Sequence, residues 1–205
     1  MDVEVVDETG QPVRQEKGEL TCQTPFPSKP IEFVNDLQGE KYRKSYFDRF
    51  DNIWCHGDYA EMTEQKGIII YGRSDNILNP GGVRIGTAEI YRQVEKVDEV
   101  MEALAVGQQW ENDVRIILFV TLKEKMSLTD ELKTAIRTVI KENSSPRHVP
   151  SKILQVPSLP KTKNGKLVEG VVRQVIHGEP VINLSTLENP ECLASFENIP
   201  ELQVA

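Results

Sequence analysis

The stretch that decides how this chain is organised is residues 71–95, YGRSDNILNPGGVRIGTAEIYRQVE. An apolar run at residues 67–71 leads into it, and an amphipathic run ends it. Between the two runs lies a segment rich in Gly, Asn and Pro that also carries charged side chains. This layout predicts a strand, a flexible joint and a helix, with polar groups placed where two packed units meet. The alternative is an ordinary hairpin between two neighbouring elements.

The composition predicts a soluble, cytosolic protein of one large domain or two small ones. The chain has 205 residues, of which 39% are hydrophobic and 27% charged. It contains no run of about 18 apolar residues, and its acidic start does not resemble a signal peptide, so no membrane partner is expected. Cys22, Cys55 and Cys192 are few and far apart. They predict free thiols, with neither a disulfide framework nor a metal site.

The net charge of −8 conceals a basic section at residues 132–177, which carries nine Lys or Arg side chains against two Glu. A local positive field of this kind favours a phosphorylated ligand, and the alternative is a solvated helix face. The same section has no aromatic side chain to stack on bases. We therefore predict no nucleic-acid partner.

Residues 1–70 predict a β-rich region. Strands are expected at residues 3–6, 18–22 and 53–58, a proline-rich surface crossing at residues 24–30, and a short amphipathic helix within residues 41–50. The third strand is predicted to end at Gly57-Asp58, where the Asp58 carboxylate would suit the two hydroxyls of a ribose. A simple turn is the alternative. His56 is interpreted as a packed or exposed side chain, since no partner at catalytic spacing supports a general base.

The remainder predicts a compact α/β unit. Helices are expected at residues 87–94, with Thr87 as N-cap, from Ser127 to residue 142, and at residues 168–176 before Gly178. Strands are expected at residues 100–106, 114–122 and 152–156. The unit should therefore hold a three-stranded sheet with helices, which makes the whole chain α+β.

A loop at residues 158–166, SLPKTKNGK, separates the last strand from the last helix. Asn164-Gly165 predicts a tight turn, and Lys166 follows it directly. A lysine on a loop is usually a solvated charge. A compact ammonium on a flexible stem also suits the neutralisation of charge where a carboxylate approaches a phosphate.

Three motifs, Gly57-Asp58, GRSDNILNPGGVRIGTAEI and PKTKNGK, in this order and spacing, resemble the closing motifs of the acyl-adenylate-forming ligase superfamily, which includes acyl-CoA synthetases, luciferases and peptide-synthetase adenylation domains. Leu78-Asn79 before the Gly-Gly-Val-Arg is similar to the acetyl- and acetoacetyl-CoA synthetase branch. The stretches KYRKSYFDRFDNIWCHGDY, SSPRHVPSKIL and NPECLASFENIPELQ resemble its acetoacetate-using members. The resemblance covers essentially the whole chain.

The resemblance implies a role for individual residues. Asp58 and Arg73 would hold the ribose hydroxyls of ATP and of the acyl-adenylate, and Asp75 would be the hinge of a mobile small domain. Lys166 would reach the substrate carboxylate and the α-phosphate. Gly82 and Arg84 would lie on the face presented to coenzyme A. The side chains implied for its nucleotide end are Lys141 and Arg147.

The resemblance also implies domain limits: the end of a large adenylating domain at residues 1–72, a hinge at 73–80, a small mobile domain at 81–178 and an extension at 179–205. The Ser/Thr/Gly-rich phosphate loop and the Thr-Glu motif that position ATP and Mg are missing, and Lys166 is followed by Leu-Val-Glu, where many relatives place an arginine. We therefore expect part of an ATP-dependent acetoacetate–CoA ligase that is inactive alone and binds ATP, CoA and Mg only weakly.

The alternative is a stand-alone nucleotide- or partner-binding module without catalysis. An apolar, unpartnered face on residues 1–70 would favour the ligase, and a polar, closed face would favour the independent module. The sequence predicts no oligomeric state.

Overall fold

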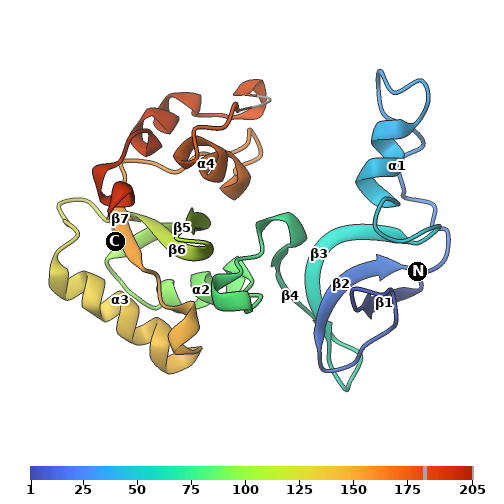
Figure 1. Cartoon of the computed structure of the whole chain (residues 1–205), viewed down its shortest axis with the longest axis horizontal. Helices are drawn as coiled ribbons and strands as arrows, with labels where there is room; N and C mark the ends of the chain where they lie inside the picture. The colour runs from blue at the N-terminus through green and yellow to red at the C-terminus, as the bar shows by residue number, and fades with distance from the viewer. Residues whose placement is uncertain (182–183, 205) are drawn as a thin grey trace. The chain divides into compact units, whose positions relative to one another are not determined.

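The computed structural model describes residues 1–181 and 184–204 and divides into two compact units, Met1–Asp75 and Asn76–Ala205 (Figure 1). We refer to them as the first and second units. None of the helices in the described ranges is both long enough and apolar enough to span a bilayer.

The first unit is a four-stranded antiparallel sheet whose strand order follows the chain. Its strands are β1 (Val3–Val6), β2 (Lys17–Cys22), β3 (Trp54–Met62) and β4 (Ile68–Arg73). The buried side chains form two small clusters, one around Val5, Ala60 and Met62 and one around Val6, Phe50 and Cys55. The β-rich character predicted for this region is confirmed.

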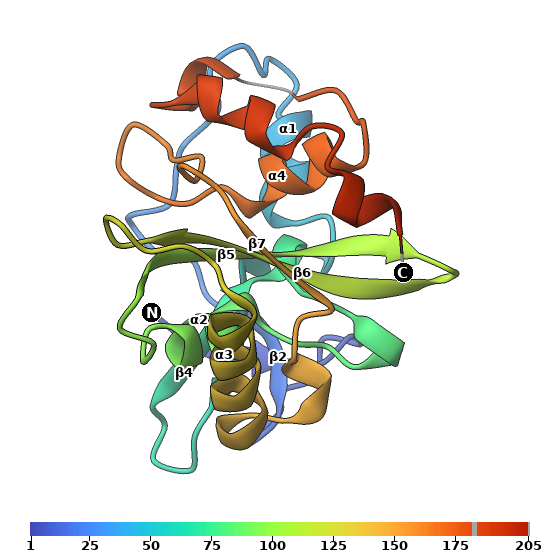
Figure 2. The same ribbon diagram turned by 90° about the vertical axis from the view of Figure 1, so that its left-hand side faces the viewer.

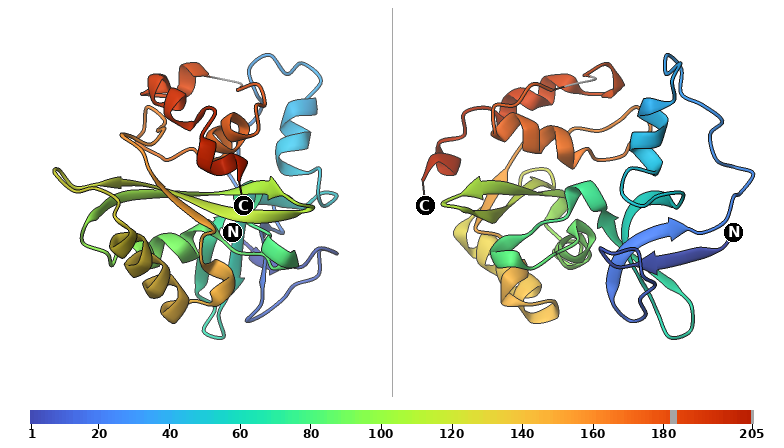
Figure 3. Two further views of the ribbon diagram at one scale, coloured as in Figure 1. Left: turned by 60° about the vertical axis from the view of Figure 1, so that its left-hand side comes forward. Right: turned by 45° about the vertical axis from the view of Figure 1, so that its right-hand side comes forward.

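One short helix, α1 (Glu40–Tyr46), confirms the helix predicted within residues 41–50 (Figure 3). None of its residues is buried, and its contact with the sheet is aromatic: the Tyr46 ring stacks on Trp54 with centroids 3.7 Å apart. Residues 24–30 form neither helix nor strand, as their three prolines require.

The prediction that a strand ends at Gly57-Asp58 is wrong. β3 continues to Met62, and a bulge interrupts its register instead: Glu19 of β2 faces Tyr59, whereas Thr21 faces Cys55. The two extra residues on β3 lie at this irregularity, and Gly57 adopts a φ of +80° within it. A bulge keeps the strand paired on both sides while it redirects the side chains at the kink. Asp58 is therefore placed within a strand rather than at its end.

The second unit has a three-stranded sheet of β5 (Val100–Trp110), β6 (Asp113–Leu122) and β7 (Lys152–Gln155) in that order. β5 and β6 are antiparallel, and β6 and β7 are parallel. The helices are α2 (Thr87–Val94), α3 (Asp130–Asn143) and α4 (Glu169–Ile176). The predicted three-stranded sheet with helices, and with it the α+β class, is confirmed. β5 runs four residues beyond the prediction because its pairing with β6 continues to Trp110.

Helices cover both faces of this sheet, as Figure 2 shows, with α2 and α3 on one side and α4 with the chain's last segments on the other. The central position of β6 explains its apolar run. Ile117 and Phe119 pack on the α4 side, and Ile116, Leu118 and Val120 pack on the α2–α3 side. A strand buried on both faces does not alternate between apolar and polar residues. In α3, Ile136 and Ile140 are fully buried and Leu128 and Leu132 pack beside them, as the four-residue spacing predicts.

The predicted start of one helix and the predicted cap of another are wrong. α3 begins at Asp130 rather than at Ser127, and Thr129 caps it, because the Thr129 hydroxyl accepts a hydrogen bond from the Leu132 amide at 3.2 Å. Thr87 does not cap α2; the N-cap residue is Gly86, whose amide donates to the Glu89 carboxylate at 2.8 Å. The start of α2 is therefore stabilised by the Glu89 carboxylate, which accepts the hydrogen bond from the Gly86 amide, and not by a hydroxyl at the N-cap.

The described residues after Gly178 pack into the core of the second unit. Two 3₁₀ turns at Pro190–Phe196 and Pro200–Gln203 bury Phe196 against Phe119, with ring centroids 4.8 Å apart. The Arg115 side chain is 9% exposed, lies 3.7 Å from the Trp110 ring, and donates to the carbonyls of Leu202 and Val204 at 2.8 Å each. The three cysteines are buried and free, as predicted.

Candidate functional site

The bulge on β3 places Asp58 directly opposite Arg73 of β4. A glycine suits this point for two reasons. Its φ of +80° disfavours other residues, and a Cβ added to it would lie 2.6 Å from the Arg73 guanidinium. The glycine therefore lets the guanidinium approach the backbone at the kink. Gly57 and Asp58 therefore act together: Gly57 leaves room for the Arg73 guanidinium, and Asp58 faces Arg73 on the next strand.

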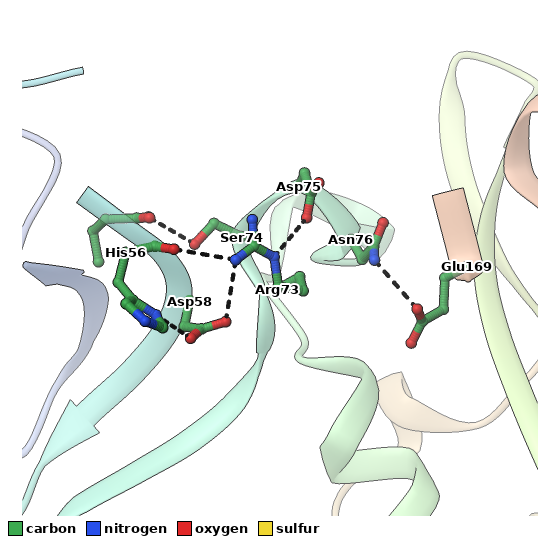
Figure 4. A network of polar contacts seen from close by, with 8 residues as sticks. His56, Asp58, Arg73, Ser74, Asp75, Asn76 and Glu169 are labelled. Carbon is green, nitrogen blue, oxygen red and sulfur yellow. Dashed lines mark hydrogen bonds and ion pairs between the residues drawn. The ribbon is translucent and has the colours of Figure 1, made fainter. Parts of the chain in front are cut away.

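The Asp58 carboxylate is held on two sides (Figure 4). Its Oδ2 lies 2.5 Å from Nδ1 of His56, and its Oδ1 lies 3.7 Å from Nη1 of Arg73. The same Nη1 donates to the His56 carbonyl at 3.1 Å. The Asp58 side chain is 18% exposed, while those of His56 and Arg73 are about half exposed at 55% and 53%. The pair thus offers an accepting carboxylate and a donating guanidinium side by side at the surface.

A buried carboxylate fixes the end of β4. Glu19 is 4% exposed, accepts a hydrogen bond from the Ser74 hydroxyl at 2.8 Å and forms an ion pair with Arg49. The next residue, Asp75, is exposed: its side chain is 72% exposed, and its Oδ1 lies 3.6 Å from Nε of Arg73. The chain is therefore anchored up to Ser74.

In the second unit, the turn Gly81-Gly82 is shaped by residues distant in sequence. The Gly81 amide donates to both carboxylate oxygens of Asp113, at 2.9 and 3.1 Å. Hydrogen bonds from the Val114 and Gly81 amides, helped by the charge of Arg147, lower the pKa of the Asp113 carboxyl. A Cβ on Gly81 would lie 2.8 Å from Nη1 of Arg147. The structure therefore brings Arg147 to this glycine turn.

The other residues expected at the coenzyme A face differ in their surroundings. Gly82 has a φ of +77° and nothing within 4 Å of its missing Cβ, so the space above it is open. Arg84 is half-buried. Lys141 is exposed on α3 and has no hydrogen bond or ion pair within the described residues. Of the four residues, Gly82 and Arg147 are thus placed at one turn, and Lys141 is not tied to it.

Lys166 lies on a small hairpin with the predicted turn at Asn164-Gly165. Gly165 has a φ of +75° and donates to the Thr162 carbonyl at 2.8 Å. Lys161 and Leu167 close the hairpin as an isolated bridge. The Lys166 ammonium is exposed and has no partner among residues 1–181 and 184–204. It is available to a ligand's negative charge.

Glu169 belongs to a network that sequence reasoning missed. It accepts a hydrogen bond from the Tyr91 hydroxyl at 3.0 Å. It also accepts one from the Asn76 side chain at 3.4 Å (Figure 4). The Tyr91 oxygen also accepts from the Ala105 amide at 3.0 Å. Burial, followed by the charge of Glu169, raises the pKa of the Tyr91 phenol far above its usual range. The hydroxyl therefore stays protonated and acts as the hydrogen-bond donor to Glu169. The acidic residue thus anchors the start of α4.

Metal ligands do not cluster in the part of the chain that the structure describes: no three His, Cys, Asp or Glu side chains are placed to hold an ion. The polar groups at hand are single carboxylates, guanidinium groups and an ammonium. Carboxylates accept hydrogen bonds from hydroxyls, and guanidinium and ammonium groups bind phosphates.

Comparison with known proteins indicates the class. Residues 89–166 match the family model of the AMP-binding enzyme C-terminal domain. The matched range begins in α2 and ends at Lys166.

Closer relatives are acetoacetyl-CoA synthetases. The chain is 58% identical over 201 residues to the acetoacetyl-coenzyme A synthetase of Rhizobium meliloti (strain 1021), covering 98% of this chain and 31% of that protein. It is 44% identical over 205 residues to the acetoacetyl-CoA synthetase of Gallus gallus, covering 99% and 31%. The solved acetoacetyl-CoA synthetase from Streptomyces lividans matches with a TM-score of 0.91 and 36% identity, covering 99% of this chain and 31% of that one. The chain thus corresponds to the carboxy-terminal portion of these synthetases and spans 31% of their length.

Proposed function

We propose that this chain is the carboxy-terminal part of an ATP-dependent ligase that joins acetoacetate to coenzyme A. The observation that carries the proposal is the pairing of Asp58 with Arg73 on adjacent strands of one unit, together with an unpartnered Lys166 on a hairpin of the other. The similarity to acetoacetyl-CoA synthetases over nearly the whole chain supports the choice of acid and of thiol.

In the first half-reaction, an oxygen of the acetoacetate carboxylate attacks the α-phosphorus of ATP. A carboxyl–phosphate bond forms, and the bond to pyrophosphate breaks. Asp58 accepts hydrogen bonds from the ribose hydroxyls and Arg73 donates to them, which fixes the nucleotide. Lys166 neutralises the negative charge that gathers as the two anionic groups meet. Positioning and charge neutralisation are sufficient, because the carboxylate is already ionised and requires no general base.

In the second half-reaction, the thiol of coenzyme A attacks the acyl carbon and AMP leaves. The open Gly81-Gly82 turn would let the pantetheine arm pass close to the backbone, and Arg84 would meet a phosphate. Arg147, and less directly Lys141, would serve the nucleotide end. Asp75 is the pivot in this proposal, and the division of the chain directly after it supports that assignment. No step is assigned to Mg, because the described residues include no ligand cluster for it.

A specific observation favours the ligase over a stand-alone binding module. The first unit exposes large apolar side chains: Ile31 is 95% exposed, Val34 89% and Leu37 105%. Exposed apolar side chains close together in sequence are typical of a surface covered by another part of a protein. An independent module would be expected to close this face.

The test is a chimera in which this chain replaces the matching region of the Rhizobium meliloti synthetase, to which it is 58% identical. We expect the chimera to exchange pyrophosphate into ATP in the presence of acetoacetate and to form acetoacetyl-CoA. A folded chimera that does neither would overturn the proposal. The chain alone should show no exchange, and measurable exchange by the chain alone would refute its dependence on the rest of the enzyme.

A further inference from the structure

The hairpin that carries Lys166 has little internal support. Inside it, the Thr162 amide donates to the Lys166 carbonyl at 2.8 Å, and the Gly165 amide to the Thr162 carbonyl at 2.8 Å. The Lys166 amide reaches the Thr162 hydroxyl at 3.2 Å. An isolated two-stranded hairpin of this size is only marginally stable in water. Its conformation therefore depends on what holds its base.

A segment from the end of the chain pairs with this base. Leu187 forms a bridge with Thr162, and the Glu188 amide donates to the Lys161 carbonyl at 2.8 Å. The Lys163 amide donates to the Thr186 carbonyl at 3.2 Å. Residues 186–188 thus add a third short strand-like segment to the hairpin. We name residues 186–189 the clamp segment.

Asn189 completes the clamp segment with its side chain. Its Oδ1 accepts a hydrogen bond from the Lys161 amide at 2.9 Å, and its Nδ2 donates to the Leu159 carbonyl at 2.9 Å. One planar amide therefore binds the backbone on both sides of Pro160, which has no amide hydrogen of its own. A side chain that only accepts or only donates could not make both bonds.

The clamp segment is itself fixed to the core. Leu187 is 4% exposed, and Cys192 and Phe196, which follow it, are 6% and 0% exposed in the cluster that includes Phe119. The hairpin base is also tied to the sheet by an ion pair between Lys161 and Glu102 at 2.6 Å. The hydrogen bonds of Asn189 thus connect a well-packed core to an exposed loop.

We infer that Asn189 is a positioning residue: through the backbone of residues 159–161 it holds the hairpin in the conformation that presents the Lys166 ammonium during adenylation. The inference rests on the proposed function of Lys166. The two can be tested separately, because the clamp has a structural readout that does not depend on activity.

The structural test is amide hydrogen exchange in the 205-residue chain. The informative amides are those of Gly165 and Lys166, which make no hydrogen bond to Asn189. In Asn189→Ala we expect them to exchange about tenfold faster, as expected for the loss of supporting hydrogen bonds of ordinary strength. Amides of β6 should be unchanged. Glu188→Ala is the matched control, since it removes only an exposed carboxylate beside Asn189.

A second variant guards against general unfolding. Asn189→Asp keeps an acceptor for the Lys161 amide but loses the donor to Leu159, so the two loop amides should exchange at an intermediate rate. If the Gly165 and Lys166 amides of a folded Asn189→Ala chain exchange at the wild-type rate, the clamp is refuted.

The functional test uses the chimera described above. Asn189→Ala should lower kcat for acetoacetate-dependent pyrophosphate exchange about tenfold, leave KM for ATP nearly unchanged, and spare thioester formation from supplied acetoacetyl-adenylate. A loosened hairpin with full pyrophosphate exchange would overturn the positioning role. If Lys166→Ala also left pyrophosphate exchange intact, the proposed function of Lys166 would fail while the clamp itself stood.

Discussion

The candidate nucleotide-binding pair of the first unit and the candidate lysine of the second unit are built on different kinds of support. Asp58 and Arg73 face each other across paired strands, with the buried Glu19 fixing the residue that follows Arg73. Lys166 lies at the tip of a hairpin that depends on the clamp segment. Strands hold geometry by themselves, whereas a loop needs distant contacts to do so. The contrast agrees with our proposal that the nucleotide pair serves both half-reactions whereas Lys166 serves only the first.

The largest effect is expected from removing the lysine. In the chimera, Lys166→Ala should lower the rate of pyrophosphate exchange by about 10²–10³-fold, the range expected when a single charge-stabilising donor is lost. Thioester formation from supplied adenylate should change little. Lys163→Ala, which removes another exposed ammonium of the same loop, is the control and should leave both rates near wild type. Equal losses in the two half-reactions would contradict the role assigned to Lys166.

A smaller effect is expected on the strand-held half. Gly57→Ala would place a methyl group 2.6 Å from the Arg73 guanidinium at a φ of +80°, so it should lower the free energy of unfolding by about 1–3 kcal/mol. It should also weaken ATP binding to the chimera, because Arg73 is displaced from Asp58. Urea unfolding and nucleotide titration measure the two effects.

Gly39→Ala is the control for Gly57→Ala, since Gly39 has a φ of +68° with nothing within 4 Å of its missing Cβ. It carries the backbone strain without the collision. Equal ATP affinity in the two variants would show that the approach of Arg73 does not matter.

A comparable change in the second unit should affect stability. Tyr91→Phe removes the hydroxyl that joins Glu169 to the Ala105 amide, leaving buried groups without partners at a cost of about 1–3 kcal/mol. Tyr71→Phe is the matched control, because the Tyr71 hydroxyl also donates to a carboxylate, that of Glu61, at 2.7 Å. Urea unfolding should show the larger loss for Tyr91→Phe, and the reverse order would remove the anchoring role of Glu169.

The smallest effect concerns a thiol of the first unit. Burial, and then the negative charge of Glu19, raise the pKa of Cys55 from 9.0 to about 11. Because the folded pKa is the higher one, this thiol favours the folded state below about pH 9, and that contribution is lost as the pH rises through about 11. Alkylation of Cys55 at pH 9, followed by peptide mass spectrometry, should be slower in the folded chain than in urea. Equal rates would refute the shift.

Sequence reasoning succeeded where the determinants are local. The four-residue spacing in α3, the apolar run of β6 and the turn at Asn164-Gly165 each follow from neighbouring residues alone. For Asp58 it singled out the residue but not its setting, because a bulge depends on the register of the facing strand.

The supporting contacts could not be predicted in this way. Asp113 reaches Gly81 across 32 residues, Asn189 reaches Lys161 across 28, and Glu169 reaches Tyr91 across 78. The stretch that begins at Asn189 resembles a known family, but nothing in it indicates that the Asn189 side chain binds residues 159–161. Such pairs become visible only when packing brings distant segments together.

The Arg115 guanidinium, held between the Trp110 ring and the carbonyls of Leu202 and Val204, has a practical consequence for protein engineering. Deleting residues 202–204 would remove the buried Leu202 side chain and would leave a buried cation without two acceptors, so it should cost far more than the loss of exposed residues would. An affinity tag fused directly to the last residues would compete with the same contacts. A tag at the amino terminus, or one joined through a flexible Gly/Ser linker, leaves the hydrogen bonds between Arg115 and these carbonyls undisturbed.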